Sequence, residues 1–310
     1  KGYALPEQRG LIVPDYSARM MFATGSLAKS GYNLPAPAAI LSCVYEGAIL
    51  PFDKALSVES KYFAKLLTSP VSRNIIRTTF LSKGAAERGA RRPKDIAKTE
   101  FKKVGVLGAG MMGAGIALVS AQAGVDVVLI DRDVETATKG KSYSQTVFGK
   151  QISRGSMAQD KADAILARIT PTDDFALLHG CDLIIEAVFE DIAIKAETTR
   201  KAEVVIPVST VYASNTSTLP ITKLAEASAR PDQFIGLHFF SPVDRMGLVE
   251  IIKGEKTSPA TLAVAMDFVA KLRKTPIVVN DSRGFYTSRV FQTLIHEGAA
   301  MLAEGVPPAV

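Results

Sequence analysis

His238 is one of three histidines in the 310-residue sequence, and a carboxylate, Glu250, follows it twelve residues later within an apolar run. Imidazole exchanges a proton near neutral pH, so the histidines are the first candidates for acid–base chemistry. A neutral imidazole can take the proton of a hydroxyl group whose carbon loses a hydride. A carboxylate beside the ring would fix its tautomer and stabilise the imidazolium that forms. We therefore interpret His238 and Glu250 as a candidate base and its partner.

The surroundings of Glu250 support a pairing but leave an alternative open. The carboxylate stands within the run Leu248–Ile252, where burying it without a partner would cost several kcal/mol. In a purely structural interpretation, His238 is a core histidine bonded to the backbone. Glu250 would then bridge to Arg245 or Lys253.

A glycine-rich turn predicts a nucleotide site. It follows an apolar strand, opens a helix and is followed by an acidic residue at the end of the next strand, Asp131. In such a turn one glycine makes the bend, one lets a pyrophosphate approach the backbone, and one lets helix and strand pack closely. The residues concerned are Gly108, Gly110, Met111, Met112 and Gly113. Asp131 would accept from ribose hydroxyls and repel a 2′-phosphate, which favours NAD, while Arg132 beside it leaves NADP open.

Two later strands end in polar residues. The carboxyl ends of the strands are where an open parallel sheet binds its ligand. After the strand at 182–187 come Glu190 and Lys195, which either face the cofactor or are a helix-start acid and a solvated lysine. After the strand at 211–214 come small hydroxyl and amide side chains at 215–218, which cap a helix or reach substrate oxygens.

The elements that position these residues are short apolar strands that alternate with amphipathic helices from Lys103 onward. This pattern predicts an α/β fold with a Rossmann-type, doubly wound and mostly parallel sheet. We expect strands at 104–107, 125–131, 182–187, 211–214, 234–238, 248–252 and 277–279. We expect a helical excursion over 133–168, a helix over 258–274 and the start of an all-α domain from Arg283.

The segment before the sheet is predicted to be a helical linker. Pro51 fits a first helical position, and the apolar face that follows runs through Thr68. Ser69 and Pro70 begin a second helix, for which Gly84 fits the stop.

Charge and composition narrow the range of partners. The net charge of +6 is concentrated between Lys83 and Lys103, which suits nucleic acid or a polyanionic ligand but is explained more simply by a solvated linker. Phe101 is the one aromatic residue in that stretch, which disfavours single-stranded nucleic acid. No run reaches the ~18 apolar residues of a membrane-spanning helix. Cys43 and Cys181 lack any metal-ligand spacing, so we predict no metal site and no disulfide.

Taken together, these motifs resemble those of the L-3-hydroxyacyl-CoA dehydrogenases. The motifs are the turn from Gly108 to Gly115, Asp131, Ser214-Asn215-Thr216-Ser217, His238-Phe239-Phe240-Ser241-Pro242-Val243 and Glu250. More narrowly, the chain resembles the dehydrogenase part of the multifunctional α-chains of fatty-acid β-oxidation, in which an enoyl-CoA hydratase domain comes first. The resemblance covers residues 100–310, and residues 1–100 are similar, with less specific motifs, to the end of that hydratase domain.

The resemblance implies roles for individual residues. It makes His238 the catalytic base, Glu250 its orienting partner and Ser217 a contact of the substrate 3-oxygen. It places Asp131 on the adenine ribose. The rest of the dinucleotide would lie along Ala187, Val188, Glu190, Lys195 and Asn215. The family often has asparagine where this chain has Ser241 and Ser288, and a serine at 288 has a shorter reach toward the thioester carbonyl.

The resemblance also implies a function: NAD-dependent oxidation of an L-3-hydroxyacyl-CoA to the 3-ketoacyl-CoA. It implies an acyl-CoA substrate and either a homodimer or a multienzyme complex with a thiolase. Location would be cytoplasmic in a bacterium, and mitochondrial or peroxisomal in a eukaryote. Two alternatives remain: a dehydrogenase of a free hydroxy acid or sugar acid, and a non-catalytic NAD-binding and assembly module.

The implied domain organisation has four parts. Residues 1–83 would be the end of a hydratase-like domain with connecting helices, and residues 84–102 a basic linker. Residues 103–282 would be the NAD-binding domain, and residues 283–310 the first helix of a truncated helical domain. The hydratase glutamates are expected before Lys1, so no hydratase activity is expected from this chain alone.

Overall fold

The computed structural model describes residues 23–25, 27 and 34–308, and the chain divides into two compact units, residues 1–84 and 85–310. In the first unit the described segments are helical. They comprise α2 (Pro35–Gly47), α3 (Phe52–Leu67), α4 (Pro70–Ile75) and the π-helical turn η1 (Ile76–Ser82). Pro70 opens α4 as predicted, and the Ser69 hydroxyl caps it by accepting the N–H of Ser72 at 3.1 Å.

Two expectations for these helices need correction. Pro51 is the residue before α3 and not its first helical residue. Gly84 does not end the second helix, because it lies inside α5 (Lys83–Glu87). A helical glycine costs only about 1 kcal/mol relative to alanine, which does not stop a helix by itself. The helix ends where Gly89 takes a left-handed conformation, with φ of +74°.

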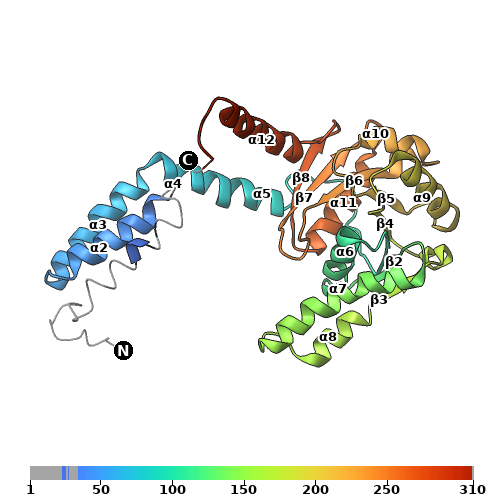
Figure 1. Cartoon of the computed structure of the whole chain (residues 1–310), viewed down its shortest axis with the longest axis horizontal. Helices are drawn as coiled ribbons and strands as arrows, with labels where there is room; N and C mark the ends of the chain where they lie inside the picture. Colours follow the sequence, from blue (N-terminus) through green and yellow to red (C-terminus); the bar gives the residue numbers. More distant parts are fainter. Residues whose placement is uncertain (1–22, 26, 28–33, 309–310) are drawn as a thin grey trace. The chain divides into compact units, whose positions relative to one another are not determined.

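The second unit contains an eight-stranded sheet with the order β3-β2-β1-β4-β5-β6-β7-β8 (Figure 1). Every neighbouring pair is parallel except β6 and β7, which are antiparallel. The strands are β1 (Lys103–Leu107), β2 (Asp126–Ile130), β3 (Ile169–Thr172), β4 (Leu183–Glu186), β5 (Val211–Ser214), β6 (Phe234–Phe239), β7 (Leu248–Lys253) and β8 (Thr275–Asn280). The predicted mostly parallel α/β sheet is therefore confirmed.

Helices cover both faces of this sheet. On one face, buried residues of α6 (Met111–Gln122), α7 (Val134–Ser153) and α11 (Pro259–Lys271) join the core. On the other, α9 (Ile192–Val205) and α10 (Ile221–Leu224) pack against the alternate strand residues. Successive strand residues point to opposite faces, so Leu183 and Ile185 join the first core while Ile184 joins the second.

The structure also corrects the predicted elements between β2 and β4. The single helical excursion is two helices, α7 and α8 (Gln159–Leu166), followed by the strand β3. β3 escaped prediction because its four residues include Pro171, which a strand tolerates at the edge of a sheet. The last helix, α12 (Thr287–Ala303), begins four residues later than predicted, since Gly284 and Phe285 take φ values of +75° and +49°.

The strand order reverses beside β1, because the chain leaves β1 for β2 and β3 and then returns to β4 on the other side. The crevice outside the carboxyl ends at such a switch point is where open α/β sheets bind ligands. The glycine turn follows β1, and the polar segments follow β4 and β5, so they meet at this edge. Among the described residues, no helix is long and apolar enough to cross a membrane.

Candidate active site

The glycine turn has the shape that a dinucleotide requires. Gly108 takes φ of +96°, and a side chain there would lie 2.5 Å from the carbonyl oxygen of Ala187. A side chain at Gly113 would lie 1.7 Å from the carbonyl oxygen of Gly108, so helix α6 approaches the strand only with glycine there. Gly110, by contrast, faces open space, with nothing within 4 Å of its missing side chain. The turn is therefore tight where it packs and open where a pyrophosphate would approach.

Asp131 lies against this turn. Its Oδ2 accepts the N–H of Ala109 at 2.6 Å, and its Oδ1 accepts the N–H of Arg132 at 2.8 Å. The Arg132 guanidinium pairs instead with Asp133, at 3.3 Å, on the surface. The position beside the turn thus presents a carboxylate, which suits the ribose hydroxyls of NAD and disfavours a 2′-phosphate.

A buried ion pair lies at the end of β4, and sequence reasoning did not predict it. Lys195 Nζ lies 2.7 Å from Oε1 of Glu186, and the two side chains are 2% and 1% exposed. Glu186 also accepts the hydroxyl of Ser214 at 2.8 Å and the N–H of Val188 at 2.9 Å. Burial raises the pKa of the Glu186 carboxyl, and Lys195 opposes that effect. Lys195 is therefore not the solvated lysine of the alternative interpretation.

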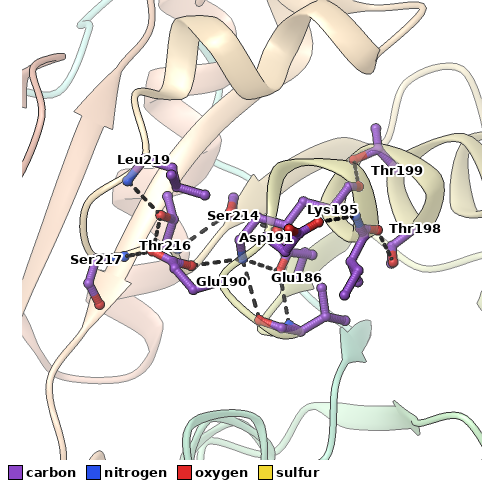
Figure 2. Close-up of polar contacts among 12 residues, drawn as sticks. Glu186, Glu190, Asp191, Lys195, Thr198, Thr199, Ser214, Thr216, Ser217 and Leu219 are labelled. Carbon is purple, nitrogen blue, oxygen red and sulfur yellow. Dashed lines mark hydrogen bonds and ion pairs between the residues drawn. The ribbon is translucent and has the colours of Figure 1, made fainter.

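Glu190 connects this ion pair to the loop after β5 (Figure 2). Its Oε2 lies 3.2 Å from Lys195 Nζ, while its Oε1 accepts the Thr216 hydroxyl at 2.5 Å and the Ser217 N–H at 3.0 Å. Partial burial would raise the pKa of Glu190, but the Thr216 hydroxyl and Lys195 outweigh it and the pKa is lowered. An ionised Glu190 thus fastens the loop that carries Ser217.

Asn215 joins the same loop to the strand of the histidine. Its Oδ1 accepts the N–H of Phe239 at 2.8 Å, and the side chain is buried. Ser217 is exposed, and the hydroxyl of Ser288, on α12, lies 3.5 Å from its carbonyl oxygen. The structure therefore brings Asn215, Ser217 and Ser288 to the edge of the sheet that also carries the histidine.

His238 and Glu250 form the predicted pair. They stand directly opposite each other in the antiparallel register of β6 and β7, and Nδ1 lies 2.7 Å from Oε2. Glu250 is fully buried and the His238 side chain is 7% exposed. Phe240 and Phe285 flank the imidazole, with ring centroids at 4.5 and 6.0 Å. The interpretation in which His238 bonds to the backbone and Glu250 to Arg245 or Lys253 is therefore wrong.

Glu250 is held ionised by further donors. Its Oε1 accepts the N–H groups of Tyr286, at 3.2 Å, and Thr287, at 2.9 Å, and its Oε2 also accepts the Thr287 hydroxyl at 2.7 Å. Burial would raise the pKa of Glu250, but His238 and Thr287 together lower it. An ionised carboxylate only accepts, so the neutral imidazole carries its proton on Nδ1 and leaves Nε2 free to accept.

Comparison with known proteins also indicates an NAD-binding dehydrogenase. Residues 103–282 match the model of a family described as 3-hydroxyacyl-CoA dehydrogenase, NAD binding domain. The chain belongs to the 3-hydroxyacyl-CoA dehydrogenase family. The match names the cofactor as NAD, so the NADP alternative is dropped.

The curated relatives of the chain are subunits of fatty acid oxidation complexes. The fatty acid oxidation complex subunit alpha of Shewanella amazonensis is 39% identical over 283 residues, which cover 90% of this chain and 39% of that one. The same subunit of Shewanella baltica strain OS155 is 38% identical over 282 residues, covering 89% of this chain and 39% of that one. The chain thus spans about two fifths of the length of these curated relatives.

Solved structures of the family superpose on part of the chain. The (S)-3-hydroxybutyryl-CoA dehydrogenase of Ralstonia eutropha is 35% identical, with a TM-score of 0.66, covering 68% of this chain and 75% of that one. The 3-hydroxybutyryl-CoA dehydrogenase of Escherichia coli K12 is 31% identical, with a TM-score of 0.65, covering 67% of this chain and 44% of that one.

Some features of this family member were not visible in its sequence. Glu186 is the last residue of an apolar strand, and only the packing of α9 shows that Lys195 turns back to it. Thr287 had no sequence signal, because the helix that starts with it was expected to begin at Arg283.

Among the described residues, no group of three side chains is placed to hold a metal ion. Burial raises the pKa of the Cys181 thiol to about 11, so this thiol is not a nucleophile at neutral pH.

Proposed function

We propose that this chain is the dehydrogenase part of a multifunctional α-chain of fatty-acid β-oxidation, and that it oxidises the 3-hydroxyl of an L-3-hydroxyacyl-CoA to the ketone. One observation carries the proposal: a histidine and a buried carboxylate, 2.7 Å apart, lie at the same sheet edge as a dinucleotide turn. The family membership supports it. The solved relatives named above are dehydrogenases of 3-hydroxybutyryl-CoA.

We propose the following roles for the residues of the site. The glycine turn and Asp131 would hold NAD, which would supply the hydride acceptor for the substrate carbon. His238 Nε2 takes the hydroxyl proton, and Glu250 holds the Nδ1–H and stabilises the positive charge that the ring acquires. Ser217 would contact the substrate 3-oxygen, and Ser288 would lie toward the thioester. Phe240 and Phe285 limit the access of water to the imidazole.

The cofactor would lie along the switch-point crevice. The backbone N–H groups at the start of α6 would bind the pyrophosphate, and Asp131 would accept from the adenine ribose. The residues proposed to hold the dinucleotide are Gly108, Gly110, Met111, Met112, Gly113, Asp131, Ala187, Val188, Glu190 and Asn215. The Lys195 ammonium points to Glu186 and Glu190, so we propose that it acts on the cofactor site through Glu190.

The relatives support further proposals about the whole protein. They are bacterial and are named as subunits of a fatty acid oxidation complex. We propose a multienzyme complex with a thiolase and a cytoplasmic location. We also propose that residues 1–83 complete a hydratase-like domain, that 84–102 link it to the NAD-binding domain at 103–282, and that 283–310 begin a helical domain.

The variant H238Q tests the proposed base. We expect NADH oxidation by acetoacetyl-CoA to fall by about 10²- to 10⁴-fold, because general acid–base catalysis contributes about that much. NADH binding, measured by calorimetry, should be unchanged. H179Q is the matched control, since His179 is exposed and lies beyond the opposite end of β4. An H238Q variant that binds NADH and retains the parent rate would rule out this base.

The same assay separates the two alternatives. Turnover of a free hydroxy acid at a rate equal to or above that of the CoA thioester would favour the free-acid dehydrogenase. Tight NADH binding by the parent chain, with no turnover of any 3-hydroxyacyl-CoA, would favour the NAD-binding module.

A further inference from the structure

The first turn of α12 is bonded to the catalytic carboxylate. Three hydrogen bonds reach Glu250 from this turn: the N–H groups of Tyr286 and Thr287 donate to Oε1, and the Thr287 hydroxyl donates to Oε2. The last is as short, at 2.7 Å, as the bond from His238 to the same oxygen. Glu250 Oε2 is thus shared between the imidazole and a hydroxyl from another element.

Glu250 takes the place of a helix cap. The residue before α12, Tyr286, makes no side-chain cap bond, so the N–H groups at the helix start need an acceptor from elsewhere. Glu250 supplies it from β7, and the positive end of the helix dipole adds to the stabilisation of its charge. The start of α12 and the carboxylate therefore hold each other in place.

The surroundings of the pair contain no competing charge among the described residues that contact it. β6 supplies His238, which is the titratable partner that faces Glu250. β8 places Ile277 opposite Glu250 in the sheet, and α12 supplies Thr287. Phe285 packs against the imidazole from the segment before α12. The negative charge at Oε2 is therefore shared between the hydrogen bonds from the imidazole N–H and from the Thr287 hydroxyl.

We propose that Thr287 is a positioning residue of the dyad, whose hydroxyl orients the Glu250 carboxylate and limits how strongly that carboxylate holds the protonated imidazole. The inference rests on the proposed function. A donor at Oε2 withdraws part of the negative charge that would otherwise act on the ring. With Thr287 in place, His238 releases its proton more readily and is available as a base at lower pH.

The variant T287V keeps the size and branching of the side chain and the backbone N–H, and it removes only the hydroxyl. Without that donor, Oε2 acts on the imidazolium alone. We expect the acidic midpoint of the kcat/KM profile for 3-hydroxyacyl-CoA oxidation to move upward by about 0.5 to 1 pH unit. Below the midpoint this is a fall of about 3- to 10-fold in kcat/KM.

Two further variants complete the experiment. T287S restores a hydroxyl and should return the midpoint to that of the parent. T293V is the matched control, because Thr293 lies on the exposed part of α12 and its hydroxyl bonds to Arg289 within the helix. A merely structural role for Thr287 would change thermal stability or KM but leave the midpoint in place. An unmoved or lowered midpoint in T287V would overturn the proposal, and so would a midpoint that T287S does not restore.

An NMR titration separates this proposal from the proposed function. With histidine-labelled protein, the resonance of His238 is assigned by its absence in H238Q, and its titration midpoint is read without turnover. An upward shift in T287V supports the role of Thr287 even if the chain proves inactive on acyl-CoA. An unchanged titration overturns that role even if H238Q confirms the base.

Discussion

Two buried carboxylates, Glu186 and Glu250, lie in the same sheet with different partners. Each is at most 1% exposed, and each has a cationic or potentially cationic neighbour at 2.7 Å. The partner of Glu186 is a lysine, which ordinarily keeps its charge across the physiological range. The partner of Glu250 is a histidine, a residue type that ordinarily gains and loses its charge in that range. The first pair can therefore hold the end of β4 in place, at the edge where we propose that the cofactor binds, while the second pair can exchange a proton.

Their pKa values also move in opposite directions. Burial raises the pKa of Glu186 in the folded state despite Lys195. The fold therefore loses stability as the pH rises from the unfolded pKa of this carboxyl through its folded pKa. The pKa of Glu250 is lowered, because His238 and Thr287 outweigh burial. Donors from two elements hold Glu250 ionised, as a base-orienting group must be. Substitutions in the Glu186–Lys195 pair should therefore reduce the free energy of unfolding, and substitutions in the Glu250–His238 pair should reduce kcat.

The variant E250Q should have the largest effect. The amide cannot fix the imidazole tautomer or stabilise the imidazolium, so we expect kcat to fall by about 10²- to 10⁴-fold. Stability should fall by less than about 2 kcal/mol, since the amide fills the same space and can still accept hydrogen bonds. Steady-state kinetics and urea unfolding measure the two, with the exposed Glu255, as E255Q, for control. A large loss of stability with an unchanged kcat would show that Glu250 serves stability and not the reaction rate.

The variant K195M should act mainly on stability. It leaves Glu186 buried without its cation, which costs about 3 kcal/mol in the free energy of unfolding. The double variant E186Q/K195M removes both charges and should recover most of that loss, which urea unfolding would measure. K201M is the control, because Lys201 forms an exposed pair with Glu197 on the same helix. If the double variant were as unstable as K195M, an unpaired charge would not be the cause.

The variant S214A removes one neutral donor from Glu186. The Ser214 hydroxyl donates to a carboxylate at 2.8 Å, and we expect the loss to cost about 1.5 kcal/mol. Thermal and urea unfolding should show it, while S209A, at an exposed serine, should change stability by less than about 0.5 kcal/mol. Equal effects of the two substitutions would contradict a role of Ser214 in solvating Glu186.

The pH dependence of stability should show the smallest effect. A carboxyl whose pKa is lower in the folded state stabilises the fold above its unfolded pKa of about 4.3, and this is lost as the pH falls through the folded value. The stability advantage of the parent over E250Q should therefore shrink as the pH is lowered from 5.5 to below about 4. Urea unfolding across that range measures it, and an advantage that grows toward acid would show that the sign is wrong.

Sequence reasoning succeeded where the determinants are local. The glycine turn was predictable because the turn itself requires glycine: Gly108 takes φ of +96°, and a side chain at Gly113 would meet the carbonyl oxygen of Gly108. The pairing of His238 with Glu250 was predictable because two strands joined by a short reversal tend to be neighbours. Their antiparallel register, which sets the two side chains face to face, required the structure.

The remaining features depend on contacts between distant elements. Lys195 bonds to Glu186 because α9 packs on the sheet, and the sequence drew attention instead to Glu190, five residues before the lysine. β3 lacks an apolar alternation and contains Pro171, so its pairing with β2 makes it a strand, at an edge where proline is tolerated. The start of α12 at Thr287 follows from two left-handed residues, and of these only Gly284 favours that conformation by its type.

The register of β6 and β7 has a consequence for protein engineering. Side chains alternate between the two faces of a sheet, so a residue inserted within either strand would turn one member of the dyad to the opposite face. An insertion in the reversal after Phe240 leaves the pairing of the strands in place and costs little in chain entropy. Attempts to reshape the substrate pocket by lengthening the chain therefore belong in this reversal, a few residues from the base that they would serve.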